Sequence, residues 1–159
     1  MSAAEAHREL SPLQRGLILA TVTTTTGLYA MTITIANVAL PKIQGAFAAT
    51  PDQVAWVVTF AILATAIVTP MTGWLTGRFG ARRVLIWSVV GFTASTLACG
   101  LAGSLTQLVI FRFAQGAFGG PLAPLCQAIV MDSYPRERQG NATAIFGMGV
   151  VIGPIIAPT

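Results

Sequence analysis

The sequence predicts an all-α membrane protein with five transmembrane helices, and three observations support this fold class. Of the 159 residues, 54% are hydrophobic and only 9% are charged, whereas a soluble domain carries about 25% charged residues. The mean hydropathy is +0.73. The charged residues leave five runs without any charge, each 19 to 28 residues long, and a helix that crosses a bilayer needs about 20. A disordered chain is excluded, because it would be rich in charge and poor in apolar residues.

The apolar stretches are expected to form five helices, with proline and glycine residues marking the connections. The expected helices span 17–40, 54–76, 84–101, 105–131 and 141–159, after a tail over 1–16. The first run is longer than the core of a signal peptide, which has about 7–15 residues, so we expect it to stay in the protein. The last run is still apolar where the sequence stops, and we therefore expect a piece of a larger protein.

The distribution of lysine and arginine predicts the orientation, because cytoplasmic loops of membrane proteins carry an excess of these residues. Seven of the nine cations lie on one side, in the tail and in the second and fourth loops, and the other side has only Lys42. We therefore expect a multi-pass protein of the cell (inner) membrane with a cytoplasmic N-terminus. Nucleic acid is not expected as a partner, because proteins that bind it gather their cations on one solvated face.

The ninth cation, Arg112, lies inside an apolar stretch, where a guanidinium costs about 2.5–3.5 kcal/mol on insertion scales. Such a residue needs a water-filled cavity, a partner, or both. On a helix, Arg112 shares one face with Gln115 and three glycines, and glycines let neighbouring helices approach closely. The three glycines are Gly116, Gly119 and Gly120. The alternative interpretation is a structural arginine that extends to the membrane surface.

The first helix contains more polar side chains than a membrane anchor needs, among them Thr32 and Asn37. The amide of Asn37 needs hydrogen-bond partners wherever it is buried. Threonine hydroxyls can bond to the backbone of their own helix, so the number of threonines does not identify a pore. These residues are expected either to line a cavity or to hold neighbouring helices together.

The short second loop combines glycines with arginines. Gly73 and Gly77 are four residues apart, which allows another helix to pass closely, and Gly80 suits a tight turn with a positive φ. The arginines, among them Arg78 and Arg82, can bind helix-end carbonyls or anionic lipid headgroups. The alternative is that this charge only sets the topology.

The last helix contains two glycines four residues apart, Gly149 and Gly153, followed by Pro154. This combination allows close packing and bending, as in a moving element of a transporter. A static kinked helix would have the same residues.

The sequence predicts neither an enzyme nor a cofactor or metal site. Cys99 and Cys126 fall inside apolar runs without a CxxC motif or a nearby histidine cluster, so packing is their expected role. The single histidine, His7, lies in the tail, and the hydroxyl groups of the helices have no neighbouring base.

Five segments, taken in order, resemble the N-terminal part of transporters of the major facilitator superfamily. The pattern is most similar to that of the drug:proton antiporters with fourteen helices. The segments are 35–41, 73–83, 108–120, 134–140 and 149–158, and the resemblance covers the chain from about 16 to 159. Each segment alone is weakly specific, whereas five in the correct order are highly specific.

The resemblance implies that the chain supplies five helices of a truncated six-helix N-terminal bundle, which moves against a second bundle around a central site. The complete protein would export drugs or other hydrophobic, often cationic compounds against an inward flow of protons, and the 159-residue chain alone is expected to be inactive. The implied partners are this small molecule, protons and the lipid bilayer. In a double-membrane bacterium they include a periplasmic adaptor and an outer-membrane channel.

The resemblance also assigns roles to residues, in three groups. The cavity for substrate and protons is assigned Thr32, Asn37, Arg112 and Gln115. The gating loop is assigned Gly73, Arg78, Gly80 and Arg82, and the antiporter motif of helix 5 is assigned Gly149, Gly153 and Pro154. The chain departs from the family where Thr32 and Gly77 stand at acidic positions. As a result no carboxylate lies deep in the five runs, and the acid that carries the proton is not identified.

Two alternatives stay open. A major facilitator carrier of another substrate class, such as a metabolite or a sugar, would share the loop and the helix-4 segment. The sequence Asn-Val-Ala-Leu-Pro at 37–41 and the Gly-Pro pair of the last helix favour the drug exporters. The second alternative for the 159-residue product is a membrane assembly piece that transports nothing.

Overall fold

The computed structural model describes residues 11–156, and within this range the chain forms six helices and no strand. The first three are α2 (Pro12–Ala46), α3 (Pro51–Phe79) and α4 (Ala81–Gly100). The other three are α5 (Leu105–Gly119), α6 (Leu122–Ser133) and α7 (Arg136–Ile156). The predicted all-α fold is confirmed.

Capping boxes begin the two longest helices. At α2 the Ser11 hydroxyl accepts a hydrogen bond from the Gln14 N–H (3.3 Å), and the Gln14 side chain accepts one from the Ser11 N–H (2.9 Å). Thr50 and Gln53 form the same pair at α3. A proline follows each cap in the first turn, where its missing N–H costs no helical bond. Both helices therefore begin earlier than predicted, at 12 rather than 17 and at 51 rather than 54.

Several other helix ends also extend beyond the charge-free runs. α2 continues through Pro41 to 46, α3 ends at 79 rather than 76, α4 spans 81–100, and α7 begins at 136 rather than 141. Charged residues at a helix end do not stop the helix, because their side chains reach the headgroups while the backbone bonds continue. Residues 12–16 of the expected tail therefore belong to α2, and residues 1–10 and 157–159 lie outside the described part of the chain.

The single helix predicted over 105–131 is wrong, because the structure divides it into α5 and α6 at Gly120 and Pro121. Pro121 and Pro124 have no N–H, so the carbonyls four residues before them lose their helical donors. Thr69 of α3 donates to the Gly120 carbonyl instead, at 3.3 Å. Gly120 and Pro121 keep helical dihedrals (φ −52, ψ −45 and φ −70, ψ −20). The span therefore bends at this point without unwinding.

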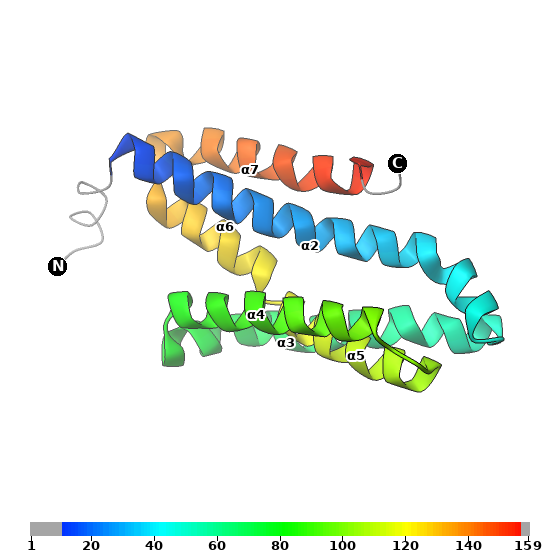
Figure 1. Cartoon of the computed structure of the whole chain (residues 1–159). Helices are drawn as coiled ribbons and strands as arrows, with labels where there is room; N and C mark the ends of the chain where they lie inside the picture. The colour runs from blue at the N-terminus through cyan, green and yellow to red at the C-terminus, as the bar shows by residue number, and fades with distance from the viewer. Residues whose placement is uncertain (1–10, 157–159) are drawn as a thin grey trace.

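The helices form two layers, which Figure 1 shows one above the other. α2, α6 and α7 pack together in one layer, and α3, α4 and α5 pack together in the other. Because α5 and α6 belong to different layers, the bend at Gly120 carries one membrane span from the layer of α3 and α4 to the layer of α2 and α7.

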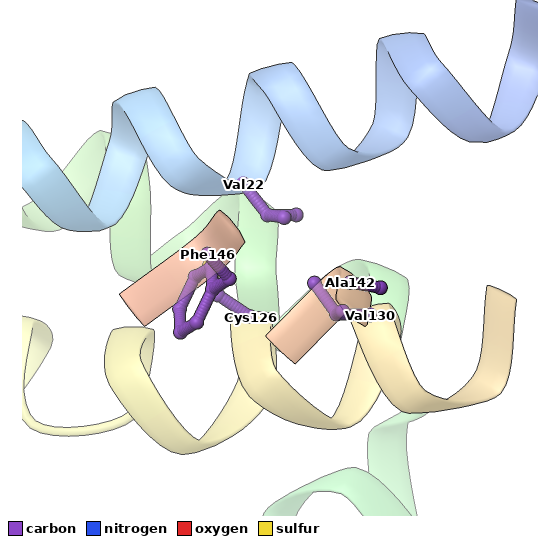
Figure 2. Close-up of a cluster of buried hydrophobic side chains, with 5 residues drawn as sticks. All are labelled: Val22, Cys126, Val130, Ala142 and Phe146. Carbon is purple, nitrogen blue, oxygen red and sulfur yellow. The ribbon is translucent and has the colours of Figure 1, made fainter. Parts of the chain in front are cut away.

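A buried apolar cluster holds α2, α6 and α7 together (Figure 2). It consists of Val22 of α2, Cys126 and Val130 of α6, and Ala142 and Phe146 of α7. Cys126 is fully buried, at 0% exposure, and it packs as a small apolar side chain, as its place in an apolar run predicted.

Large apolar side chains cover much of the outside of the bundle, as Trp87, Val90 and Leu97 do on α4. Three helices, α2, α3 and α4, are long and apolar enough to cross a membrane by length and composition. α5 and α6 have 15 and 12 residues, so they can complete a span only together. An apolar surface of this extent matches a lipid environment.

Candidate functional site

Arg112 begins a chain of hydrogen bonds that connects α5 with α4. Its Nη1 donates to Oε1 of Gln115 at 2.9 Å, and Nε2 of Gln115 donates to Oγ1 of Thr96 at 2.7 Å. The Thr96 hydroxyl donates in turn to the Phe92 carbonyl at 2.8 Å. The bond between Arg112 and Gln115 forms because residues three apart on a helix lie on one face. Gln115 is 5% exposed, so its amide is held in one orientation by a partner on each side.

The guanidinium of Arg112 keeps donors that no group of residues 11–156 uses. Gln115 takes one of its five N–H groups, and Nε is buried without a hydrogen-bond partner. A buried donor without a partner costs free energy. Arg112 is therefore fixed in place by Gln115 and still able to donate to a further group.

Arg112 lines two cavities between α2 and the other layer. The larger has a volume of about 370 Å³ and is lined by polar groups of Thr32, Arg112 and Gln115 among apolar side chains. The smaller has a volume of about 70 Å³ and is lined by Asn37 and Arg112. All four residues that the sequence assigned to a cavity therefore lie on the walls of these two cavities.

The two α2 residues present different groups to these cavities. The Thr32 hydroxyl donates to the Leu28 carbonyl of its own helix at 2.8 Å, which leaves its lone pairs to face the larger cavity. Asn37 is exposed, and its amide faces the smaller cavity without a bond inside the described part of the chain. Together they give the cavities one acceptor and one amide beside the guanidinium of Arg112.

The glycines on the Arg112 face allow the close approach that the sequence predicted. A Cβ on Gly116 would overlap the backbone of Ala61 in α3, and a Cβ on Gly120 would lie 3.2 Å from the Thr65 carbonyl oxygen. Gly119 approaches α2 instead, where a Cβ would lie 2.5 Å from the Tyr29 ring. α5 is therefore in contact with both layers along this face.

Hydrogen bonds from two threonines of α3 hold α5 in this position. Thr65 donates to the Gly116 carbonyl at 3.1 Å and Thr69 to the Gly120 carbonyl at 3.3 Å, and each hydroxyl is shared with a carbonyl of its own helix. The pairs are four residues apart on both helices, so they repeat once per turn. The sequence analysis missed these threonines and Thr96. A hydroxyl in an apolar run was the only signal, and many other threonines share it.

The second loop contains the turn that was predicted for it. Gly80 has a φ of +85° and ends α3 directly before α4 begins. Arg78, Arg82 and Arg83 are exposed there, and the Arg78 guanidinium lies 6.0 Å from the Trp74 ring. Within residues 11–156, nothing lies within 4 Å of a Cβ built on Gly73, so the close helix contact expected at this position is not formed by the described helices.

The antiporter-motif segment lies in α7, which packs on α2. A Cβ on Gly149 would overlap the Thr23 side chain, and a Cβ on Gly27 would lie 3.5 Å from the Gly149 carbonyl oxygen. Among the described glycines of α2 and α7, Gly149 therefore marks the closest approach of the two helices. Gly153 and Pro154 lie within the bounds of α7, but their side-chain surroundings are outside the described part of the structure.

The described residues offer no group of three or more metal-ligating side chains. Cys99 and Cys126 are both free thiols. Cys99 lines the larger cavity beside Arg112, whereas Cys126 belongs to the core.

Comparison with known proteins identifies the family. The model described as Major Facilitator Superfamily matches residues 22–159. The multidrug export protein EmrB of Haemophilus influenzae is 42% identical over 95% of this chain, and the fatty acid resistance protein FarB of Neisseria gonorrhoeae is 39% identical over 92%. EmrB of Escherichia coli is 41% identical over 79%. The chain spans 30%, 30% and 24% of the length of these relatives.

The fold agrees with a solved transporter structure. A bacterial homologue of the human lysosomal transporter Spinster, in an inward-facing and unoccupied conformation, superposes with a TM-score of 0.83 at 26% identity. The match covers 93% of this chain and 31% of that structure. The apolar helices, their packing and the matched family model lead to one conclusion. The chain is a multi-pass membrane protein that belongs to the major facilitator superfamily.

Proposed function

We propose that the complete protein exports small hydrophobic compounds in exchange for protons, and that this chain forms the N-terminal part of its transport cavity. The observation that carries the proposal is the bonded series Arg112–Gln115–Thr96 on the wall of an otherwise largely apolar cavity. The similarity to multidrug export proteins supports export over the uptake of a metabolite or a sugar.

The proposed membrane is the cell (inner) membrane, and the N-terminus is proposed to be cytoplasmic. Seven of the nine cations support this orientation, because they lie in the tail and in the second and fourth loops. The cavities beside Arg112 then lie in the half of the bundle nearer the external side, since α5 begins at Leu105 directly after an external loop.

The charge of the cavity favours acidic compounds. Arg112 is the single formal charge among the residues that line the larger cavity, and its free donors suit a carboxylate. Ile35, Ile43 and Phe47 offer an apolar wall for the body of the compound. This lining supports acids over the cations that the family resemblance suggested. The similarity to a fatty acid resistance protein agrees with that chemistry.

The proton is proposed to travel on an acid outside the described residues. Within 11–156, Asp52 lies in the first turn of α3, Asp132 near the end of α6, and Glu137 in the first turn of α7, all at helix ends. An acid supplied by the rest of the protein could pair with Arg112 when ionised and release it to the substrate when protonated. Because the acid and the substrate would compete for Arg112, the movement of the proton would be coupled to the export of the substrate.

The remaining roles follow the same proposal. Gly73, Arg78, Gly80 and Arg82 would act as the gating loop against the second bundle. Gly149, Gly153 and Pro154 would let α7 bend and slide on α2. A periplasmic adaptor and an outer-membrane channel stay predictions for a double-membrane bacterium.

The decisive experiment replaces Arg112 in the complete transporter. Inside-out vesicles are supplied with a proton gradient, and uptake of a fluorescent hydrophobic carboxylic acid and of its methyl ester is measured per inserted protein. Arg112→Ala should lower uptake of the acid at least about tenfold, because a hydrogen bond to a charged group contributes about 1.5–3 kcal/mol. Arg112→Lys should restore only part of it, since lysine lacks the planar fork of donors.

The matched control is Arg136→Ala, an arginine of the fourth loop at the start of α7. It should leave uptake of both compounds at the parental level. If Arg112→Ala transports the acid as fast as the parent, Arg112 is a structural residue and the cavity assignment fails.

A further inference from the structure

Thr96 of α4 lies on the wall of the larger cavity with Arg112 and Gln115, and the sequence assigned it no role. Its hydroxyl accepts a hydrogen bond from Nε2 of Gln115 at 2.7 Å and donates to the Phe92 carbonyl at 2.8 Å. The bonded series that begins at Arg112 in α5 therefore ends on the backbone of α4. Because the backbone of a helix is held by its own hydrogen bonds, this end of the series is fixed.

The direction of these hydrogen bonds follows from the chemistry of the two ends. The Phe92 carbonyl can only accept, and the guanidinium of Arg112 can only donate. The Thr96 hydrogen is therefore used on Phe92, and the Thr96 oxygen is the acceptor that faces Gln115. This acceptor selects the amide nitrogen of Gln115, which turns the amide oxygen toward Arg112. Thr96 and Arg112 thus favour the same orientation of one amide from opposite sides.

The loss of the Thr96 hydroxyl should change the position of Arg112. Gln115 is only 5% exposed, so its amide nitrogen would become a buried donor without a partner, which is unfavourable. A rotation of the amide toward another acceptor would relieve this cost. The same rotation would withdraw Oε1 of Gln115 from Nη1 of Arg112, which is now 2.9 Å away. Arg112 would then lose the bond that fixes its guanidinium.

We propose that Thr96 is a positioning residue, which fixes the guanidinium of Arg112 at the cavity wall through the amide of Gln115. Its effect on transport rests on the proposed function, in which Arg112 binds a carboxylate. A guanidinium forms two parallel hydrogen bonds to a carboxylate only when the two planar groups are aligned. Thr96 therefore determines how strongly the cavity prefers an acid to its uncharged ester.

A direct contact between Thr96 and the transported compound is the alternative, because Thr96 lines the cavity itself. The single hydroxyl hydrogen is used on the Phe92 carbonyl, so Thr96 keeps no donor for a carboxylate. An acid would gain nothing from the remaining lone pair of the hydroxyl. The observed bonds therefore favour a role through Gln115 over a direct contact.

Thr93 offers a matched control on the same helix. Its hydroxyl donates to the Val89 carbonyl four residues before it at 2.8 Å, just as Thr96 donates to Phe92. Thr93 is exposed, and it lines neither of the two cavities beside Arg112. Valine at either position removes one hydroxyl and keeps the branched shape of the side chain. A difference between Thr96→Val and Thr93→Val therefore reports the bond to Gln115.

The first experiment observes Arg112 in the complete, detergent-purified transporter by NMR with ¹⁵N-labelled arginine. A guanidinium that hydrogen bonds hold in place rotates slowly and gives separate Nη signals, whereas a mobile one gives an averaged signal. Arg112→Lys identifies the signals that belong to Arg112. The parent, Thr93→Val and Thr96→Ser should show separate signals, because each keeps the hydroxyl beside Gln115. Thr96→Val should show an averaged signal.

The second experiment measures uptake of the fluorescent carboxylic acid and of its methyl ester in the same vesicles as for Arg112. Thr96→Val should raise the KM for the acid about two- to tenfold, as expected for the loss of one hydrogen bond. Its kcat and its uptake of the ester should stay at the parental level. In a Gln115→Leu background, Thr96→Val should have no further effect, because Thr96 acts through Gln115.

Each outcome decides between these roles. Separate Arg112 signals in Thr96→Val, or an averaged signal in the parent, overturn the proposal. An additional loss of acid uptake in the Gln115→Leu background would assign Thr96 a direct contact instead. Thr96→Ala replaces a valine variant that does not fold, and if neither folds, Thr96 is a structural residue and the proposal is wrong. If Arg112→Ala transports the acid at the parental rate, the proposed function fails, and the NMR signals alone decide the role of Thr96.

Discussion

At the scale of single residues, the amide of Gln115 organises the site. Its oxygen accepts from Arg112 and its nitrogen donates to Thr96, so both ends of one side chain are used. A guanidinium inside a membrane protein is costly unless it is bonded. Gln115 reduces this cost and still leaves Arg112 on the walls of both cavities.

Gly116 is the residue at which a single methyl group should have the largest effect on packing. Gly116→Ala would place a Cβ against the Ala61 carbonyl and push α5 away from α3, which also stretches the bond from Thr65. We expect a loss of about 1–3 kcal/mol, as in other overpacked sites. The thermal unfolding temperature of the complete transporter in detergent measures it.

Gly16→Ala is the control for this substitution, because nothing lies within 4 Å of a Cβ at that position. It should leave the unfolding temperature equal or higher, since alanine favours a helix over glycine. Equal unfolding temperatures for Gly116→Ala and Gly16→Ala would show that α3 and α5 are not in close contact.

The sequence could predict Arg112 and Gln115 together because the relation between them is local. Residues three apart face the same side of any helix, whatever packs against it. Thr96 lies nineteen residues from Gln115 on a different helix. Which helix covers which face depends on the tertiary arrangement, and the pattern of residues in one run does not contain it. For the same reason the sequence could not predict the bonds from Thr65 and Thr69 to α5 and its C-terminal end.

At the scale of elements, the bend between α5 and α6 decides how the layers connect. Pro121 and Pro124, three residues apart, remove two helical donors on the same side of the span, and Thr69 satisfies one of the carbonyls that they leave. The apolar stretch over 105–131 predicted one continuous helix here, because hydropathy does not register missing N–H groups. The signal was present in Gly-Gly-Pro at 119–121 and in Pro124.

Replacing both prolines should straighten the span. In Pro121→Ala, Pro124→Ala the backbone can restore the lost helical bonds, which would draw α6 away from α2 and α7. Cys126, now 0% exposed in the core of that layer, should then react faster with a maleimide. The measurement uses the complete transporter with Cys99 and any other cysteine outside α6 replaced by alanine.

Pro70→Ala serves as the comparison, because Pro70 lies inside α3 where the helix is not divided. It should leave the labelling rate of Cys126 unchanged. The explanation of the bend is wrong if the double variant labels as slowly as the parent.

The helix starts show what else the charge pattern could not predict. Ser11–Gln14 and Thr50–Gln53 are visible in the sequence as capping boxes followed by proline. They place the helix ends several residues outside the apolar runs. Charge-free length therefore predicted the number and order of spans, whereas the capping residues determine where the helices begin.

At the scale of the whole molecule, the distribution of arginine over the tail and the loops predicts the orientation. We expect a reporter fused after Arg83 or Gly140 to be cytoplasmic and one fused after Thr50 or Ser104 to be external. The excess of arginine in the tail, the second loop and the fourth loop is the reason. Paired reporters, one active only in the cytoplasm and one only outside, give the measurement. A cytoplasmic signal from Ser104 would contradict this arrangement of spans.

The span formed by α5 and α6 is held to different helices in its two halves, and this has a mechanical consequence. Its first half is fixed to α3 by the threonine bonds to Gly116 and Gly120, and its second half is fixed to α2 and α7 by the core around Cys126. The bend between them has fewer backbone bonds than the helix on either side, so it is the most compliant joint of the span. A tilt of α6 with its layer would be absorbed at this joint, and Arg112 would keep its geometry while the opposite end of the same span changes its angle.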